Sequence, residues 1–282
     1  MPTWSSTRSC SNPNPDDWSA LKIAVAGKGG VGKTTIAGSL ARIWAQDGMR
    51  VLAVDADPSA HLHTILEISD EDSPKPISSE LDLIEERTGA RPGSATGPFF
   101  KLNPRVDDIP KMYSRVGADG VRLLVLGTIK AAGGGCFCPE NALLRGLLDH
   151  IILEEDEAVV VDMEAGLEQF GRATCRGVDM LLVVVEPGSK SVDTASRIDK
   201  LAREMSVRRT IVVGNRVRDE EERQSLVEVL RGKGLELSYA LPYSPSVARA
   251  DLERVSPFGA SGSEEWLDSV RRFSKEILIG QA

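Results

Sequence analysis

One short stretch limits the possible folds of this chain more than any other. Residues Gly27–Thr34 read Gly-Lys-Gly-Gly-Val-Gly-Lys-Thr, and they stand between an apolar run, Leu21–Ala26, and a helical pattern that continues to Trp44. The spacing matches the pattern G-x-x-x-x-G-K-S/T, whose glycines let backbone N–H groups face phosphates while the following helix points its positive end at them. The sequence therefore predicts a strand, a phosphate-binding loop and a helix, in that order.

The residue types within this loop have separate chemical tasks. The ammonium group of Lys33 is expected to reach the β- and γ-phosphates, and the hydroxyl of Thr34 is expected to bind Mg²⁺. The predicted nucleotide contacts of the segment are Gly27, Lys28, Gly29, Gly30, Val31, Gly32, Lys33, Thr34 and Thr35.

Apolar, β-branched runs alternate with helical patterns along the rest of the chain. Further strands are predicted at Arg50–Asp55, Val121–Leu126, Ala158–Asp162, Met180–Val185, Thr210–Val213 and Glu236–Leu241. Helices are predicted at Glu80–Arg87, Pro139–Leu153, Leu167–Arg176, Ser191–Met205, Glu220–Arg231 and Glu264–Leu278. Such alternation indicates an α/β fold with a mostly parallel central sheet and helices on both faces. We expect a single domain over residues 21–282, preceded by a polar, disordered tail at 1–20.

The composition excludes some classes of protein. With 41% hydrophobic and 27% charged residues, the chain resembles soluble globular proteins. The longest apolar runs are far shorter than the roughly 20 residues of a membrane span. A formal net charge of −8 argues against a broad nucleic-acid-binding face. Four cysteines do not form a disulfide framework in a chain of this size, so a reducing cytoplasm is expected.

Two predicted strands end in acidic residues. Asp55-Ala56-Asp57-Pro58 follows one of them, and Asp162-Met163-Glu164-Ala165-Gly166 follows another. Ligand sites in open α/β sheets lie beyond the carboxyl ends of the strands, so Asp55, Asp57 and Asp162 are expected beside the phosphate loop. Asp55 is interpreted as a support for the loop, and Glu164 is left unassigned.

The early lysine of the loop narrows the family. The form G-K-G-G-x-G-K-T-T, with Lys28 at its second position, resembles the deviant Walker A group of P-loop ATPases, which includes nitrogenase iron protein, the arsenite and tail-anchored-protein ATPases, and the Min and Par proteins. The resemblance implies a P-loop NTPase fold and hydrolysis of ATP to ADP. It also implies an ATP-dependent homodimer in which Lys28 contacts the phosphates of the partner.

The same resemblance implies catalytic roles for four residues. Lys28 and Lys33 would stabilise charge on the phosphates. Asp57 resembles the aspartate of the first switch, which positions the attacking water, and Asp162 resembles the aspartate of the second switch, which holds Mg²⁺ through water. Gln169 stands where this family would suggest a histidine, which puts histidine-assisted coupling in doubt.

A further segment bears on the choice of base. Guanine-specific P-loop proteins carry an N-K-x-D signature, whereas residues 215–218 read Asn-Arg-Val-Arg and lack the aspartate. Asn215, expected after its strand, resembles the adenine-contacting asparagine of the deviant Walker A group, and Pro242 lies in a segment that resembles the one closing over the base. ATP is therefore favoured over GTP.

A pair of cysteines narrows the resemblance further. Residues 136–141 read Cys-Phe-Cys-Pro-Glu-Asn, and together with the strings FFKLNPRVD, NALLRGL and VDMLLVVVEP they resemble the CooC-type ATPases, accessory factors in the maturation of nickel-containing carbon monoxide dehydrogenase. The resemblance implies that this metalloenzyme is the client of the chain.

The cysteine pair itself predicts a metal site. Thiolate is a soft ligand that suits nickel or zinc. Cys136 and Cys138 supply only two ligands, and a two-fold dimer would bring a second pair to complete four thiolates. We therefore expect an intersubunit site, with the choice between Ni²⁺ and Zn²⁺ open. Cys10, Cys175, His61 and His63 are not expected to bind metal.

Two other functions remain open at this point. One is a Min- or Par-type positioning switch, which would use membrane or DNA. The stretch Trp266, Val270, Phe273 and Ile277 has helical spacing, but packing on the sheet is the commoner role for such a stripe, so membrane contact is not favoured. The other is a CooC-like factor that serves a different metalloenzyme.

Overall fold

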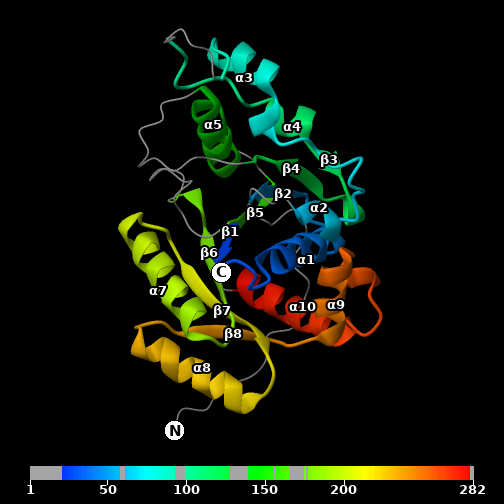
Figure 1. Ribbon diagram of the computed structural model, residues 1–282, viewed down its shortest axis with the longest axis vertical. Helices are drawn as coiled ribbons and strands as arrows, with labels where there is room; N and C mark the ends of the chain where they lie inside the picture. Colours follow the sequence, from blue (N-terminus) through cyan, green and yellow to red (C-terminus); the bar gives the residue numbers. More distant parts are fainter. Residues whose placement is uncertain are drawn as a thin grey trace.

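The computed structural model describes residues 21–57, 61–92, 99–127, 139–154, 157–164, 175 and 177–279. Its centre is an eight-stranded sheet in the order β3-β4-β2-β5-β1-β6-β7-β8 (Figure 1). The strands are β1 Lys22–Gly27, β2 Val51–Ala56, β3 Arg115–Val116, β4 Arg122–Val125, β5 Ala158–Met163, β6 Met180–Val185, β7 Thr210–Val217 and β8 Leu237–Pro242. Neighbouring strands run parallel except for the short edge pair β3–β4.

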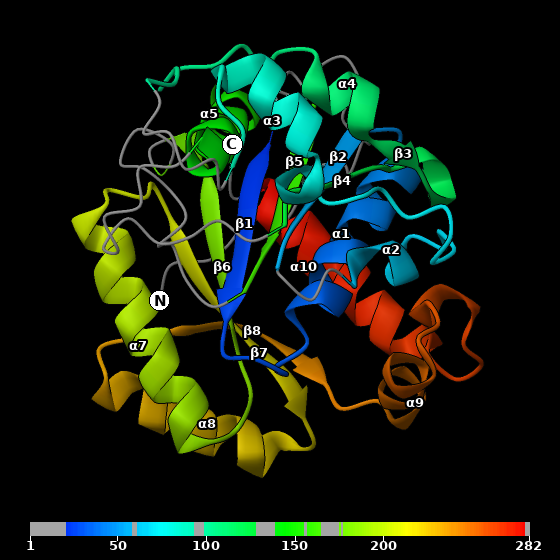
Figure 2. The same cartoon turned by 45° about the horizontal axis from the view of Figure 1, so that its top comes forward.

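Helices cover the sheet on both sides (Figures 1 and 2). They are α1 Lys33–Gln46, α2 Leu62–Ile65, α3 Leu81–Thr88, α4 Ile109–Tyr113, α5 Pro139–Glu154, α7 Ser189–Glu204, α8 Glu220–Gly232, α9 Pro245–Glu253 and α10 Glu264–Ile279, with 3-10 turns η2 Ile77–Ser79, η3 Ala118–Gly120 and η5 Pro257–Gly259. Residues of α3, α5, α7 and α8 pack in one core on one face, and residues of α1, α2 and α10 pack in a second core on the other face.

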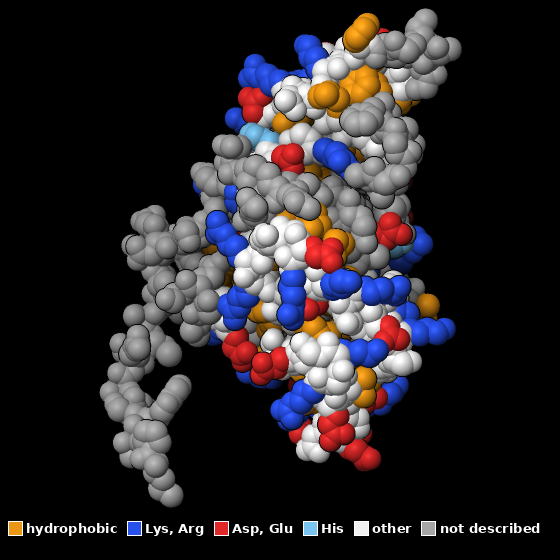
Figure 3. Space-filling view, turned by 90° about the vertical axis from the view of Figure 1, so that its left-hand side faces the viewer, with side chains coloured by type: hydrophobic (Ala, Val, Ile, Leu, Met, Phe, Trp, Pro, Cys, Tyr) orange, Lys and Arg blue, Asp and Glu red, His pale blue; other side chains and the backbone are white. Residues whose placement is uncertain are grey.

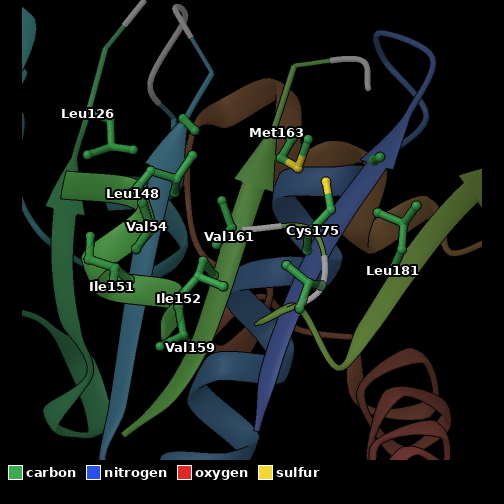
Figure 4. Packing of buried hydrophobic residues seen from close by; sticks show 14 of the residues in the cluster. Val54, Leu126, Leu148, Ile151, Ile152, Val159, Val161, Met163, Cys175 and Leu181 are labelled. Atoms are coloured by element: carbon green, nitrogen blue, oxygen red, sulfur yellow. The ribbon is translucent and has the colours of Figure 1, made fainter. Parts of the chain in front are cut away.

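The central strands are apolar on both faces because both faces are covered. Every residue of β1, β2, β5 and β6 is buried. Successive side chains go to opposite cores, as a strand requires: Ala24 lies in the core beneath α5 and α7, and Val25 lies in the core beneath α1. Figure 4 shows Ile151 and Ile152 of α5 packed against strand residues such as Val161.

The predicted fold class is confirmed. The seven predicted strands are all present, and most of their ends agree to within one residue. β7 is the exception, since it continues to Val217 rather than stopping at Val213. The predicted helix at Leu167–Arg176 and the predicted tail at 1–20 lie outside the described residues, apart from Cys175.

The apolar stripe of the last helix packs inside the protein. Trp266, Val270, Phe273 and Ile277 are at most 2% exposed and belong to the core that also contains α1. This arrangement agrees with the packing role and leaves that face of α10 unavailable for a membrane. Within the described residues, no helix combines the length and apolar character that a membrane crossing requires.

A buried arginine ties α1 to three neighbouring elements. The guanidinium group of Arg42 is almost fully buried and lies 4.0 Å from the centre of the Phe258 ring. It donates hydrogen bonds to Asp119 Oδ2 at 2.6 Å, Glu67 Oε1 at 2.6 Å, the Ile65 carbonyl oxygen at 3.2 Å and Ser256 Oγ at 2.9 Å. These contacts join α1 to the ends of α2, η3 and η5, so that the helix following the phosphate loop has a fixed position.

We predict that Arg42→Met lowers the free energy of unfolding by about 3 kcal/mol, because it leaves acceptors on several elements without their charged donor. Urea unfolding measures this difference. Arg223→Met is the matched control, since Arg223 forms an exposed pair with Glu220, and such pairs contribute about 1 kcal/mol or less. Equal losses in the two variants would contradict a special role for Arg42.

Candidate nucleotide-binding site

The phosphate loop begins and ends at glycines that no other residue could replace without strain. Gly27 closes β1 with φ +149°, and a Cβ atom there would collide with the backbone oxygen of Val184 in β6. Gly32 precedes α1 with φ +92°, and a Cβ atom there would collide with the side-chain amide of Asn215. The loop is therefore shaped by close approach of two other strands as well as by its own sequence.

Asn215 braces the loop from the neighbouring part of the sheet. Its Nδ2 donates a hydrogen bond to the Val31 carbonyl oxygen at 2.8 Å, and the side chain is buried. The expectation that Asn215 follows its strand is wrong, because it lies within β7. The pairing of β7 with β8 shifts register between Gly214 and Val217, and such irregularities re-aim side chains.

A hollow beside Asn215 collects the residues predicted to surround the base. Its lining includes Gly32 and Thr35 of the phosphate-loop segment, together with Asn215 and Pro242. The hollow is open to solvent and has a volume of about 20 Å³, room for little more than one water molecule. Tyr243 borders the same hollow and is exposed.

Two residues expected to hold Mg²⁺, Thr34 and Asp162, lie together in the structure. Thr34 Oγ1 donates to Asp162 Oδ2 at 2.5 Å, which joins the first turn of α1 to the end of β5. Asp162 is buried, and its Oδ1 atom has no hydrogen-bond partner within the described part of the chain. Hydroxyl and carboxylate oxygens are the ligands that Mg²⁺ prefers, so the residues present fit this cation.

Two buried carboxyl groups lie next to each other in this site. Asp55 of β2 and Asp162 of β5 are register partners in adjacent parallel strands. Burial raises the pKa of Asp162 to about 8, with the negative charge of Asp55 as the next contribution, while Thr34 and Lys33 lower it. Burial also raises the pKa of Asp55 to about 6. The pair therefore retains protons at pH values at which ordinary aspartates have lost them.

Asp55 also fixes the segment that carries Asp57. One carboxylate oxygen of Asp55 accepts the backbone N–H of Asp57 at 3.1 Å, and the other accepts that of Leu62 at 3.0 Å. Both ends of the segment between β2 and α2 are thus held by one side chain, so Asp55 supports this segment, whereas it was expected to support the phosphate loop. The charge of Asp57 raises the pKa of Asp162, so the two carboxyl groups lie within electrostatic reach.

The two lysines of the loop occupy different surroundings. Lys33 is buried and acts electrostatically on Asp162. Lys28 points to the end of β6, where its Nζ lies 3.3 Å from Glu186 Oε1. Arg216 Nη1 lies 3.6 Å from the second oxygen of the same carboxylate. Sequence reasoning missed Glu186, because the pair joins residues that are remote along the chain.

The structure tests few of the soft-metal predictions. Cys136 and Cys138 lie outside the described residues, as does Gln169. Within the part of the chain that the structure describes, no group of three or more His, Cys, Asp and Glu side chains could hold a metal ion. Cys175 is buried, and burial raises the pKa of its thiol to about 12, which keeps it protonated. His63 Nε2 lies 2.8 Å from Asp70 Oδ1.

Comparison with known proteins decides the family. The family model described as "CobQ/CobB/MinD/ParA nucleotide binding domain" matches residues 22–258. The chain belongs to this family. The carbon monoxide dehydrogenase accessory protein CooC of Rhodospirillum rubrum is 43% identical over 86% of this chain and 90% of its own length. An uncharacterised ATP-binding protein of Methanocaldococcus jannaschii is 45% identical over 82% of this chain and 88% of its own length.

Solved structures agree on the fold. MinD of Pyrococcus horikoshii, in complex with Mg-ADP, matches with a TM-score of 0.63 at 15% identity and covers 92% of this chain and 96% of its own. A ParA family ATPase of Chlorobium tepidum matches with a TM-score of 0.62 at 17% identity, over 90% of this chain and 98% of its own. These likenesses support the P-loop NTPase fold, and family membership confirms the expected ATPase, with ATP and Mg²⁺ as its ligands.

We predict that the nucleotide-free protein in EDTA loses stability as the pH rises from about 5.5 to about 8.5. Asp55 and Asp162 have folded pKa values above their unfolded ones, so the folded state binds more protons, and this stabilisation is lost as the pH passes through about 6 and about 8. Each unit of pKa difference corresponds to about 1.4 kcal/mol. Asp107, whose pKa is lowered to about 2, titrates below this range.

Urea unfolding at both ends of the pH range tests this prediction. Asp162→Asn removes one of the two titrating groups, so its stability should depend less on pH than that of the wild type. A pH dependence of equal size in both proteins would show that the buried pair is not its source.

Proposed function

We propose that this chain is an ATP-hydrolysing maturation factor that couples ATP-dependent dimerisation to nickel binding and delivery into carbon monoxide dehydrogenase in the cytoplasm. The observation that carries the proposal is the 43% identity to CooC, which extends over most of both proteins. The Cys-Phe-Cys-Pro-Glu-Asn string supplies the soft ligands that such a task needs, and the cysteine usage suits a reducing compartment.

The described residues support a simple division of work in hydrolysis. Lys33 binds the phosphates, and Thr34 with Asp162 holds Mg²⁺, directly and through water. The cation neutralises charge on the phosphates when it is bound. Asp57 orients the attacking water, and the hydrogen bonds from Asp57 and Leu62 to Asp55 keep that segment beside the site.

The nickel part of the proposal follows from ligand number. Cys136 and Cys138 of one chain offer two thiolates, and a two-fold dimer offers four. Because phosphate loop and cysteines belong to one chain, closure of the dimer around ATP would change the distance between the two cysteine pairs. By linkage, the metal then alters the affinity for ATP by the same factor.

A second candidate is a maturation factor for a different metalloenzyme, since the surface that a client binds has no recognisable sequence signature. A Min- or Par-type positioning switch is less favoured, because the apolar stripe of α10 is buried and because the cysteine pair has no role in it.

We predict that Asp57→Asn still binds ATP but hydrolyses it at least about 100-fold more slowly. A group that positions the attacking water, or accepts its proton, acts on the reaction step and not on binding. Binding of ATP with Mg²⁺ and steady-state phosphate release measure the two effects. Asp47→Asn, in an exposed position after α1, is the control and should hydrolyse ATP at the wild-type rate. Both the wild type and this control should hydrolyse little GTP. Undiminished turnover in Asp57→Asn would refute the assignment.

We predict one Ni²⁺ or Zn²⁺ ion per dimer and loss of this binding in Cys136→Ala/Cys138→Ala. Equilibrium metal binding, measured with ADP and with ATP, tests stoichiometry and nucleotide dependence together. Cys10→Ala is the matched control and should bind as the wild type does. Equal metal affinity in the wild type and the double variant would refute the site, and one tightly bound ion per monomer would refute its intersubunit geometry.

A further inference from the structure

Lys28, the lysine expected to reach the partner subunit, forms a contact within its own chain. Its ammonium nitrogen lies 3.3 Å from Glu186 Oε1. We propose that Glu186 is a positioning residue that holds Lys28 on its own subunit and so opposes dimerisation until ATP is bound. The inference rests on the proposed function, because the proposed ATP-dependent dimer is where Lys28 contacts the phosphates of the partner.

Glu186 is held in place on three sides. It follows β6 directly, and its backbone N–H donates to Ser191 Oγ in the first turn of α7 at 3.1 Å. Its second carboxylate oxygen lies 3.6 Å from Arg216 Nη1. The Lys28 and Glu186 side chains are 38% and 27% exposed, so the pair can open without unpacking any core. The acceptor is thus fixed, and the lysine is the partner that can move.

Among the described residues that line the hollow beside Lys28, no unpaired carboxylate is present. The hollow that it borders, about 640 Å³ in volume, is also lined by Lys190, Arg197 and Lys233. The carboxylate in that lining belongs to Asp193, which already pairs with Lys233 at 2.8 Å. Figure 3 shows Lys and Arg side chains spread over the side of the molecule on which α7 lies in Figure 1. A Lys28 released from Glu186 would therefore meet like charges here and is free to turn to an anion on another molecule.

Arg216 connects this contact to the nucleotide. It shares the carboxylate of Glu186 with Lys28, and it also lines the hollow that runs from Gly32 to Pro242. Its backbone has φ +60°, an uncommon conformation for a residue with a side chain. A base at the mouth of that hollow would meet Arg216. Because Arg216 and Lys28 pair with the same carboxylate, a nucleotide that touches Arg216 also bears on the strength of the Lys28 contact.

The size of the effect follows from the exposure of the pair. An exposed ion pair changes an equilibrium by a few-fold, and a two-fold dimer contains two copies of it. Removal of the Glu186 charge should therefore lower the dimer dissociation constant in ATP by about 4-fold to about 25-fold.

The test is sedimentation over a range of protein concentrations with ATP and Mg²⁺, in an Asp57→Asn background that does not hydrolyse ATP. Glu186→Gln should dimerise more tightly by the stated factor. Glu222→Gln is the matched control, because Glu222 borders a hollow together with Glu186 but pairs with Arg218 instead of Lys28. It should dimerise as the background protein does. Lys28→Ala should weaken the dimer, and adding Glu186→Gln to it should have no further effect.

A second readout separates positioning from a structural role. With hydrolysis intact, Glu186→Gln should raise ATPase activity per chain at low protein concentration and leave the rate at saturating protein unchanged, with an unaltered urea midpoint. If Glu186→Gln and Glu222→Gln dimerise alike while Lys28→Ala weakens the dimer, the role of Glu186 is refuted and the proposed function stands. If the Asp57→Asn protein stays monomeric in ATP, both the role of Glu186 and the ATP-dependent dimer of the proposed function are refuted.

Discussion

Two carboxyl groups, Asp55 and Asp162, are buried side by side at the ends of adjacent strands. Burial of two like charges is unfavourable, and the contacts of the neighbouring residues offset part of this free energy. Without a cation, the pair lowers this free energy by retaining protons and by accepting hydrogen bonds, from Thr34 in one case and from backbone N–H groups in the other. A divalent cation bound here would offset the repulsion between the two carboxylate charges. Asp162 Oδ1 still has no hydrogen-bond partner within the described residues, and the Mg²⁺ of the proposed function would supply one.

The helix that receives the phosphates is fixed at more than one level. Its N-terminus follows Gly32, which lies against Asn215, and its middle is held by the buried guanidinium group of Arg42. Because Arg42 also donates to the carbonyl oxygen of Ile65, α1 is joined to the short helix after the Asp57 segment. One buried side chain thus links α1 to α2, η3 and η5.

The sequence was sufficient where a local pattern decides the structure. The phosphate loop, the central strands and the positions of Asp57 and Asp162 follow from motif spacing and apolar periodicity, and the structure places them as expected. Asn215 was expected after its strand but lies within β7. The register shift between β7 and β8 leaves no trace in the apolar pattern of the sequence. Glu186 and Arg42 were missed for a different reason. Their roles arise from contacts between remote residues, and only the folded sheet brings these together.

The hydrogen bond from Asn215 to Val31 has a consequence for the choice of base. It commits one of the two amide N–H groups to the loop and so fixes the orientation of the amide, which leaves the amide oxygen and the second N–H for a ligand at the hollow. An oxygen only accepts hydrogen bonds. Adenine carries an amino group at its six-position that can donate to it, whereas guanine carries a carbonyl oxygen there and would set two acceptors against each other. If the hollow takes the base as proposed, the packing that shapes the phosphate loop also sets, through this one bond, the orientation of the amide that a purine meets.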